Sequence, residues 1–289
     1  MDIIKKTKRD TLLFLIATII FGTNGMISRY IHVSSFFLVA CRGIIASIFI
    51  YLILRFQKKR INWESIKANR NNLLLSGLSL GFMWIFLYTG YQYSVSITCL
   101  LNNMAPIFVV VISALIYKER LKNKQIICIV FVLLGVLMVS GVFENKLIAN
   151  AYSFIFGFLS LLCFCINILI NRKMKNIEPI ERTLIQMFLS FIVASIVTII
   201  TKQMPTQIDL TSVLLIVLLG VFNTGLAYVL YYDAISTLPA YKIAIIGYLE
   251  PVISIILSVS ILHENMTIFS IIGSIIIIVS TCVSELIEK

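Results

Sequence analysis

The sequence predicts an all-α integral membrane protein with ten transmembrane helices in two inverted five-helix repeats. Composition, the spacing of the apolar segments and the placement of the basic residues together predict this fold class. Of the 289 residues, 60% are hydrophobic and only 13% are charged, and the mean hydropathy is +1.01. Soluble domains are about 45–50% apolar and about 25% charged. A soluble fold of this length would need a polar surface that this composition cannot supply.

Ten segments are long and apolar enough to cross the hydrocarbon core of a bilayer, which takes about 20 residues of helix. The largest polar connectors, 57–71 and 171–181, leave no room for a soluble domain. The predicted spans are residues 10–29, 34–56, 72–92, 95–117, 123–142, 149–171, 181–201, 211–234, 239–262 and 266–286.

The basic residues predict the topology. With the N-terminus inside, 19 of the 24 Lys and Arg residues lie in inner segments. Three lie in outer segments (Arg29, Lys146 and Lys202) and two lie within spans (Arg42 and Lys242). This asymmetry follows the positive-inside rule and predicts a multi-pass protein of the cell membrane with both termini in the cytoplasm. The net charge of +11 therefore indicates orientation in a lipid bilayer, and nucleic acid is not expected as a partner.

Two sequence features recur at nearly the same offset. Pro106 and Pro251 are each followed thirteen residues later by a glutamate, Glu119 and Glu264, at an offset of 145. The segment 21–29 shares a phenylalanine, an asparagine, an isoleucine and an arginine with the segment 164–172, at an offset of 143.

The recurrence predicts two repeats, residues 10–142 and 149–286. Because each repeat has an odd number of helices, the second enters the membrane in the opposite orientation. Many secondary transporters are built from such inverted repeats, with the substrate site between the repeats near the midplane of the bilayer.

Further motifs lie at the ends and centres of the spans: Phe21-Gly22-Thr23-Asn24, Arg42, Ala234-Ile235-Ser236-Thr237 and Leu249-Glu250-Pro251-Val252. With the two inverted halves and the Pro…Glu spacing, they resemble the EamA-type branch of the drug/metabolite transporter superfamily over nearly the whole chain. The resemblance implies a transporter of small metabolites. It does not indicate the substrate, because that branch includes exporters of amino acids and other metabolites as well as some importers.

Ionisable groups inside the spans are the first candidates for function, because they are costly in a membrane. Glu250 lies about ten residues into its span, roughly 15 Å deep, and is the candidate for binding a substrate ammonium or for coupling to protons. The alternative is a structural carboxylate paired with Arg42. Pro251 removes a backbone hydrogen bond and loosens the helix beside Glu250. Arg42 either binds a substrate carboxylate or holds two helices together, and the structural role is favoured.

Buried amides form a second group, since each must find a partner on another helix or face a wet cavity. The repeat-equivalent Asn24 and Asn167 are expected to bridge helices. Asn102 and Asn103 precede Pro106, where the loosened turn favours a place in the cavity.

Aromatic side chains form a third group. Trp84 and Tyr88 share one helix face, Tyr228 lies in the eighth span, and Tyr248 precedes Glu250 by two residues. Their rings can line a cavity and contact an aromatic or cationic substrate.

No cofactor or metal is expected. Neither histidine has carboxylates or cysteines at ligand spacing, and no nucleotide-binding loop or nucleophile motif is present. Cysteines are confined to apolar segments, which indicates packing residues. Gly77-x-x-x-Gly81 can bring together two helices of one chain or two chains of a homodimer. The apolar stretch after the N-terminal lysines lacks a cleavage site and is interpreted as a retained first helix.

These observations predict a secondary active transporter of small metabolites, an exporter of an amino acid or a related metabolite that works by alternating access and is coupled to protons. Import of a cationic metabolite such as a quaternary amine is the alternative. A membrane-embedded lipid enzyme is a remote alternative, because the chain lacks paired carboxylates or a histidine–acid cluster at one interface.

Overall fold

The computed structural model describes residues 2–28, 30–59, 61–93, 98, 101–102, 104–105, 108–110, 112–113, 123–139, 151–262 and 267–287, which are helical apart from turns and connectors. Contacts group the chain into two compact units. Unit 1 contains residues 1–85 and 166–237, and unit 2 contains residues 86–165 and 238–289.

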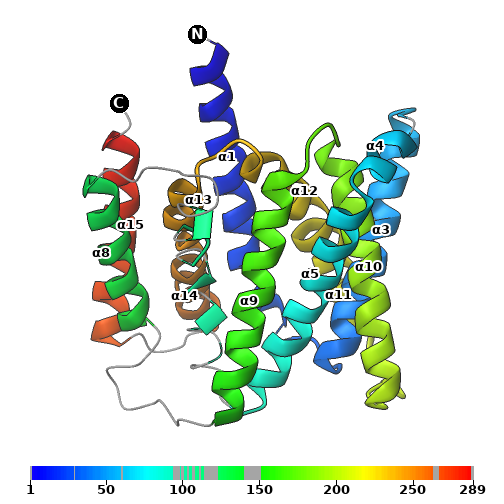
Figure 1. Ribbon diagram of the computed structural model, residues 1–289. Helices are drawn as coiled ribbons and strands as arrows, with labels where there is room; N and C mark the ends of the chain where they lie inside the picture. The colour runs from blue at the N-terminus through cyan, green and yellow to red at the C-terminus, as the bar shows by residue number, and fades with distance from the viewer. Residues whose placement is uncertain are drawn as a thin grey trace. The chain divides into compact units, whose positions relative to one another are not determined.

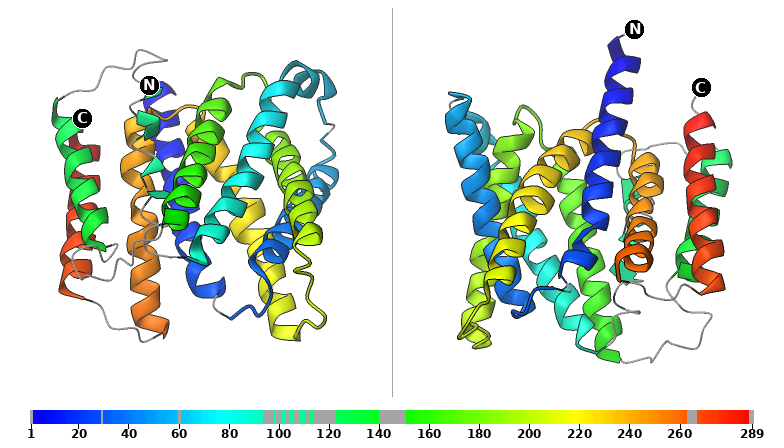
Figure 2. Two further views of the ribbon diagram at one scale, coloured as in Figure 1. Left: turned by 60° about the horizontal axis from the view of Figure 1, so that its bottom comes forward. Right: turned by 180° about the vertical axis from the view of Figure 1, so that it is seen from behind.

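Unit 1 contains most of the long helices (Figure 1). They are α1 (Asp2–Gly22), α2 (Asn24–Ser28), α3 (Ser35–Phe56), α4 (Trp63–Ala68), α10 (Pro179–Ile200), α11 (Leu210–Leu218), the π-helix η2 (Leu219–Leu226) and α12 (Ala227–Ile235), with most of α5 (Arg70–Tyr91) and the second part of α9 (Ala151–Lys173). Helix α3 lies beside α10, and α1 lies beside α12 (Figure 2).

Six stretches of helix in the described residues are long and apolar enough to cross a membrane. They are Lys8–Ser28, Ser35–Phe56, Arg70–Gly90, Phe154–Lys173, Pro179–Ile200 and Leu210–Ile235, and they coincide with six of the predicted spans to within a few residues. Two shorter apolar stretches, Ile126–Met138 and Ile271–Ser280, fall in the fifth and tenth predicted spans. Much of the predicted span 95–117 lies outside the described residues. The all-α class is therefore confirmed, whereas the number of transmembrane helices, ten, remains a prediction.

Short polar residues cap the starts of three helices of unit 1. The Ser34 and Asn62 side chains accept hydrogen bonds from the backbone N–H groups of Phe37 and Ser65, at the starts of α3 and α4. At the start of α11, Asp209 accepts from both the hydroxyl and the backbone N–H of Ser212, and these bonds lower the pKa of this exposed carboxyl. Each of the bonds from a backbone N–H satisfies a group that the helix itself leaves free.

Glycines set the close approach of the helices in unit 1. A Cβ atom added at Gly77 or Gly81 of α5 would lie 2.6 Å from Leu189 Cδ1 or 2.9 Å from Val193 Cβ, both on α10. The Gly-x-x-x-Gly segment therefore packs within the chain. Likewise, Gly220 of η2 packs against Ile45 of α3, so that α3 is held closely by its neighbours.

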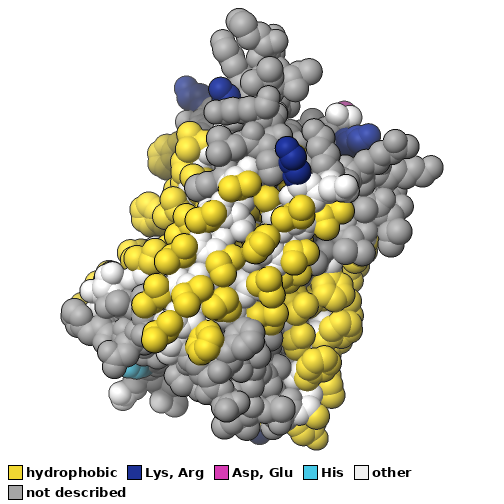
Figure 3. Space-filling model, turned by 90° about the vertical axis from the view of Figure 1, so that its left-hand side faces the viewer, with side chains coloured by type: hydrophobic (Ala, Val, Ile, Leu, Met, Phe, Trp, Pro, Cys, Tyr) yellow, Lys and Arg dark blue, Asp and Glu magenta, His cyan; other side chains and the backbone are white. Residues whose placement is uncertain are grey.

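Unit 2 contains α8 (Asn123–Val139), α13 (Ala240–Gly247), α14 (Leu249–Leu262) and α15 (Ile268–Ile287), together with the first part of α9. Helices α8 and α15 pack side by side, and a Cβ atom at Gly135 would lie 2.8 Å from the carbonyl oxygen of Gly273. Their outer face exposes large apolar side chains (Figure 3), including Ile127 and Ile275 at 54% and 55%. Such a face suits contact with lipid rather than water.

The predicted span 239–262 is broken in the structure. Helix α13 ends at Gly247 and α14 begins at Leu249, so the break lies three to four residues before Pro251. Proline has no N–H for the carbonyl four residues earlier, which is that of Gly247, and its ring crowds the same carbonyl. Pro251 therefore accounts for the break, and Glu250 lies in the first turn of α14.

Candidate functional site

Arg42 is the centre of a polar cluster inside unit 1. It lies on α3, its side chain is 5% exposed, and its Nε donates a hydrogen bond of 2.9 Å to Oγ1 of Thr224 on η2. The Thr224 hydroxyl donates in turn to the carbonyl of Leu219, also at 2.9 Å. Among the residues that the structure describes, Nη1 and Nη2 of Arg42 have no recorded acceptor, and no carboxylate lies within ion-pair distance.

Aromatic rings extend this cluster. The guanidinium carbon of Arg42 lies 5.4 Å from the centre of the Trp84 ring, and the Tyr228 ring meets Trp84 edge-on at 5.8 Å. Phe21 of α1 contacts Tyr228 at 4.9 Å between ring centres. Three residues that the sequence singled out separately, Arg42, Trp84 and Tyr228, thus form one cluster.

The π-helix η2 connects the cluster to a break in the first span. Asn223 donates hydrogen bonds to the carbonyl of Ile20 (2.7 Å) and to the hydroxyl of Thr23 (2.8 Å), where α1 gives way to α2. π-Helical segments are rare and occur frequently at functional sites. In this protein the π-helical turn contains Asn223, which bonds to Ile20 and Thr23 at the α1–α2 break, and Thr224, which accepts the hydrogen bond from Arg42.

The other predicted substrate residues belong to unit 2. Asn102 accepts a hydrogen bond of 2.9 Å from Ser160 of α9, and Tyr88 is half-buried. Tyr248 is buried, at the break between α13 and α14. Glu250 is exposed, and no hydrogen bond or ion pair is recorded for it within the described part of the chain. Asn103 and Pro106 lie outside the described residues.

The two repeat-equivalent asparagines differ in their contacts. Asn167 of α9 donates to the carbonyl of Ser76 (2.8 Å) and accepts from the Tyr232 hydroxyl (3.2 Å), so it connects α9 with α5 and α12. Oδ1 of Asn24 is buried, and in the described part of the structure it has no hydrogen-bond partner.

The sequence did not single out Arg182, which lies at the start of the predicted span 181–201. It lies in the first turns of α10, is 1% exposed, and donates through Nη1 and Nη2 to the carbonyls of Asn171 and Tyr232. Gln186, one turn further along, exchanges hydrogen bonds with Asn171. The spacing of four between Arg182, Gln186 and Ser190 was the available signal, because it predicts one polar stripe on an apolar helix.

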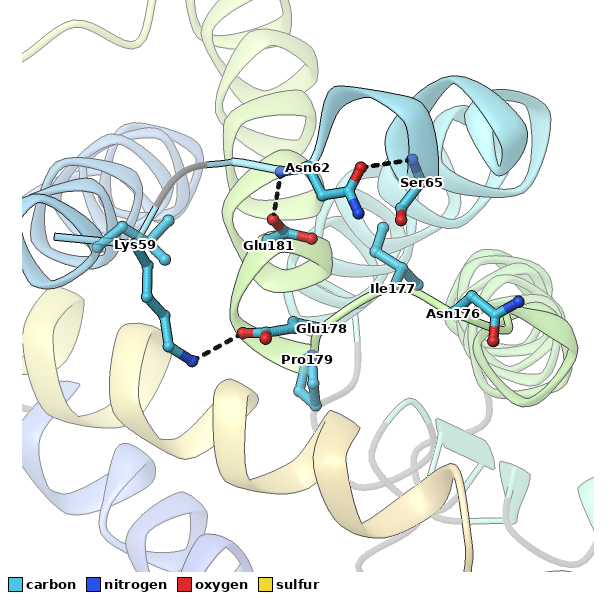
Figure 4. A pocket seen from close by; sticks show the side chains of 9 residues that line it. Lys59, Asn62, Ser65, Asn176, Ile177, Glu178, Pro179 and Glu181 are labelled. Carbon is cyan, nitrogen blue, oxygen red and sulfur yellow. Dashed lines mark hydrogen bonds and ion pairs between the residues drawn. The ribbon is translucent and has the colours of Figure 1, made fainter. Parts of the chain in front are cut away.

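A pocket of about 540 Å³ lies where the connector after α3 meets the start of α10 (Figure 4). Lys59 pairs with Glu178 at 2.9 Å, and the backbone N–H of Asn62 donates to Glu181 at 2.7 Å. None of the predicted site residues lines this pocket, and the charged and polar groups that line it bond to one another. These bonds stabilise the connector between α3 and α4 against the start of α10.

Comparison with known proteins assigns the family. The EamA-like transporter family matches residues 10–141 and 151–285. The chain is 25% identical over 258 residues to the uncharacterized transporter YxxF of Bacillus subtilis (strain 168), covering 88% of this chain and 82% of that protein. It is also 25% identical over 223 residues to an uncharacterized transporter of Archaeoglobus fulgidus, covering 75% and 76% of the two chains.

A solved crystal structure of a protein with 15% sequence identity superposes with a TM-score of 0.85, covering 96% of this chain and 98% of the other, and so has the same fold. The relatives are named as transporters and not as enzymes. The chain therefore belongs to the EamA-like transporter family, and is a multi-pass membrane transporter of small molecules.

Proposed function

We propose that the protein is a secondary active transporter that exports an amino acid or a related metabolite by alternating access. In this proposal, residues 10–142 and 149–286 act as inverted repeats whose rearrangement exposes the substrate to either side in turn. Glu250 couples this movement to protons.

Glu250 carries the proposal. Its side chain is exposed in the first turn of α14, directly after the helix break, within a predicted span whose other charged residue is Lys242. A carboxylate that faced lipid at this depth would be costly, so an exposed one is expected to face water or substrate. A group in such a place can exchange protons as its surroundings change during transport.

The test uses proteoliposomes and a mixture of radiolabelled amino acids. We expect uptake by the wild-type protein to rise when a pH gradient is imposed, and uptake by Glu250→Gln to be the same with and without the gradient. Asp209→Asn is the matched control, because it neutralises an exposed carboxylate outside the spans. A gradient response that persists in Glu250→Gln would exclude the coupling role, and absence of uptake by the wild type would exclude amino-acid transport.

One observation speaks against the alternative, import of a quaternary amine. The face of Trp84, the ring most suited to hold a cation, already lies against the Arg42 guanidinium. A second cation there would be repelled. Stabilisation by choline and not by amino acids in a thermal-shift panel would instead favour the import of a cation.

A further inference from the structure

We infer that Arg42 is the carboxylate-binding residue of the transporter, so that the transported compound carries a free carboxylate. This inference rests on the proposed function and names the chemical group that the substrate must present. It concerns a cluster in unit 1, whereas Glu250 lies in unit 2.

The Arg42 guanidinium is largely buried, and within the described part of the chain most of its donors are unused. Its side chain is 95% buried, and one of its five N–H donors is used, by Nε to Thr224. The four N–H groups on Nη1 and Nη2 have no recorded acceptor among the described residues, and neither does the charge have a counter-ion there. A charge that is largely buried and has no counter-ion is unfavourable. A carboxylate would satisfy both the charge and the paired donors, since its two oxygens match the guanidinium fork.

Arg182, which is also buried in the same unit, differs from Arg42 in its contacts. Both of its terminal nitrogens donate to backbone carbonyls, those of Asn171 and Tyr232. Arg182 thus has the contacts expected of an arginine that joins helices. Among the described residues, Arg42 forms a hydrogen bond only through Nε, so the N–H groups on Nη1 and Nη2 are left for a ligand.

The Arg42 guanidinium is held in place by its neighbours before any ligand binds. The Thr224 hydroxyl is fixed by its bond to the Leu219 carbonyl, so a lone pair is directed at Nε. The Trp84 ring supports the guanidinium plane. Next to Arg42, a Cβ atom on Gly43 would lie 3.0 Å from the Met187 carbonyl of α10, so the backbone at this point has little room to shift. A donor group that is held in place before binding loses less entropy when the ligand arrives.

The charge balance favours a monoanion. In the described part of the structure, Arg42 is the only cation recorded in contact with Trp84 or Thr224. One positive charge neutralises one carboxylate, whereas a phosphate dianion would leave excess negative charge in an apolar unit. Inorganic phosphate is therefore a comparison ligand in the test.

The experiment measures ligand binding to the purified full-length protein by thermal shift and by calorimetry. The probes are leucine and phenylalanine, each paired with its carboxamide, together with inorganic phosphate. We expect the amino acids to bind and stabilise the protein, and the carboxamides and phosphate not to. Arg42→Gln should weaken amino-acid binding by roughly 10- to 100-fold, because charge-assisted hydrogen bonds are lost.

Arg42→Lys retains the charge without the fork and should bind with intermediate affinity, and Thr224→Val should also weaken binding. Lys202→Gln is the control, because it removes an exposed positive charge. If Arg42→Gln does not fold, as judged by gel filtration, Arg42→Lys decides the question. Equal binding of acids and carboxamides, no binding of either acid, or unchanged affinity in Arg42→Lys would overturn the inference.

The transport assay separates this inference from the proposed function. Binding of the acids that depends on Arg42, without any transport in proteoliposomes, would support the carboxylate site and exclude the proposed transport of amino acids. Transport of leucinamide that is unaffected by Arg42→Gln would support a transporter and exclude the carboxylate site.

Discussion

At the scale of single residues, unit 1 contains two buried arginines with different surroundings. Arg182 uses Nη1 and Nη2 to bind carbonyls in the last turns of α9 and α12, where the partial negative charge of a helix end favours a cation. Arg42 uses Nε alone. The sequence predicted that Arg42 would be buried, but not which of its atoms would be bound.

Arg182→Met tests the structural role. The substitution keeps much of the side-chain volume but leaves the carbonyls of Asn171 and Tyr232 without their donors, and a lost buried hydrogen bond of this kind costs about 1–3 kcal/mol. We expect a clear fall in the thermal unfolding midpoint of the detergent-solubilised protein. Lys173→Gln, an exposed change at the end of α9, is the control. An unfolding midpoint equal to that of the wild type would show that Arg182 does not stabilise the fold.

At the scale of elements, three of the described spans depart from the regular α-helix. The first is broken between α1 and α2, the eighth predicted span contains the π-helix η2, and the ninth is broken between α13 and α14. Pro251 signals the break in the sequence, because proline cannot bond the carbonyl of Gly247. No comparable signal marks η2. Its wider turn is stabilised by long-range contacts, such as that of Asn223 with the Ile20 carbonyl.

The packing of α5 against α10 provides a prediction at this scale. Gly81→Ala places a methyl group 2.9 Å from Val193 Cβ and 3.2 Å from Ser190 Cα, so the helices must move apart, and overpacking costs typically 1–3 kcal/mol. Gly247→Ala is the matched control, since a Cβ atom there meets nothing within 4 Å. We expect a lower unfolding midpoint for Gly81→Ala than for Gly247→Ala. The reverse order would contradict the close packing of α5 on α10.

At the scale of the whole molecule, the packing units differ from the predicted repeats. Unit 1 joins residues 1–85 to residues 166–237, so each unit takes helices from both halves of the chain. Adjacent spans in the sequence need not share a unit, because helices are grouped by which of their faces pack together.

The predicted topology can be tested by cysteine labelling in a variant without native cysteines. A membrane-impermeant maleimide should label Lys202→Cys in intact cells, and should label Lys175→Cys only after permeabilisation, because positive-inside placement puts Lys175 in the cytoplasm. Both positions are exposed in the structure, so access to the reagent depends on the side of the membrane. The opposite pattern would place the termini outside.

The all-α membrane class, the approximate limits of the apolar helices and the family follow from the sequence, because they depend on local hydropathy, charge and motif spacing. The sequence also singled out Arg42, Trp84 and Tyr228 one at a time. The tertiary structure alone decided that these three meet, that Gly77 and Gly81 pack within the chain, and that Arg182 is buried. Most of these contacts join residues about 40 to more than 140 positions apart, and that of Arg182 with the Asn171 carbonyl joins residues 11 positions apart. In an apolar helix, local periodicity barely distinguishes the face that meets lipid from the face that meets another helix.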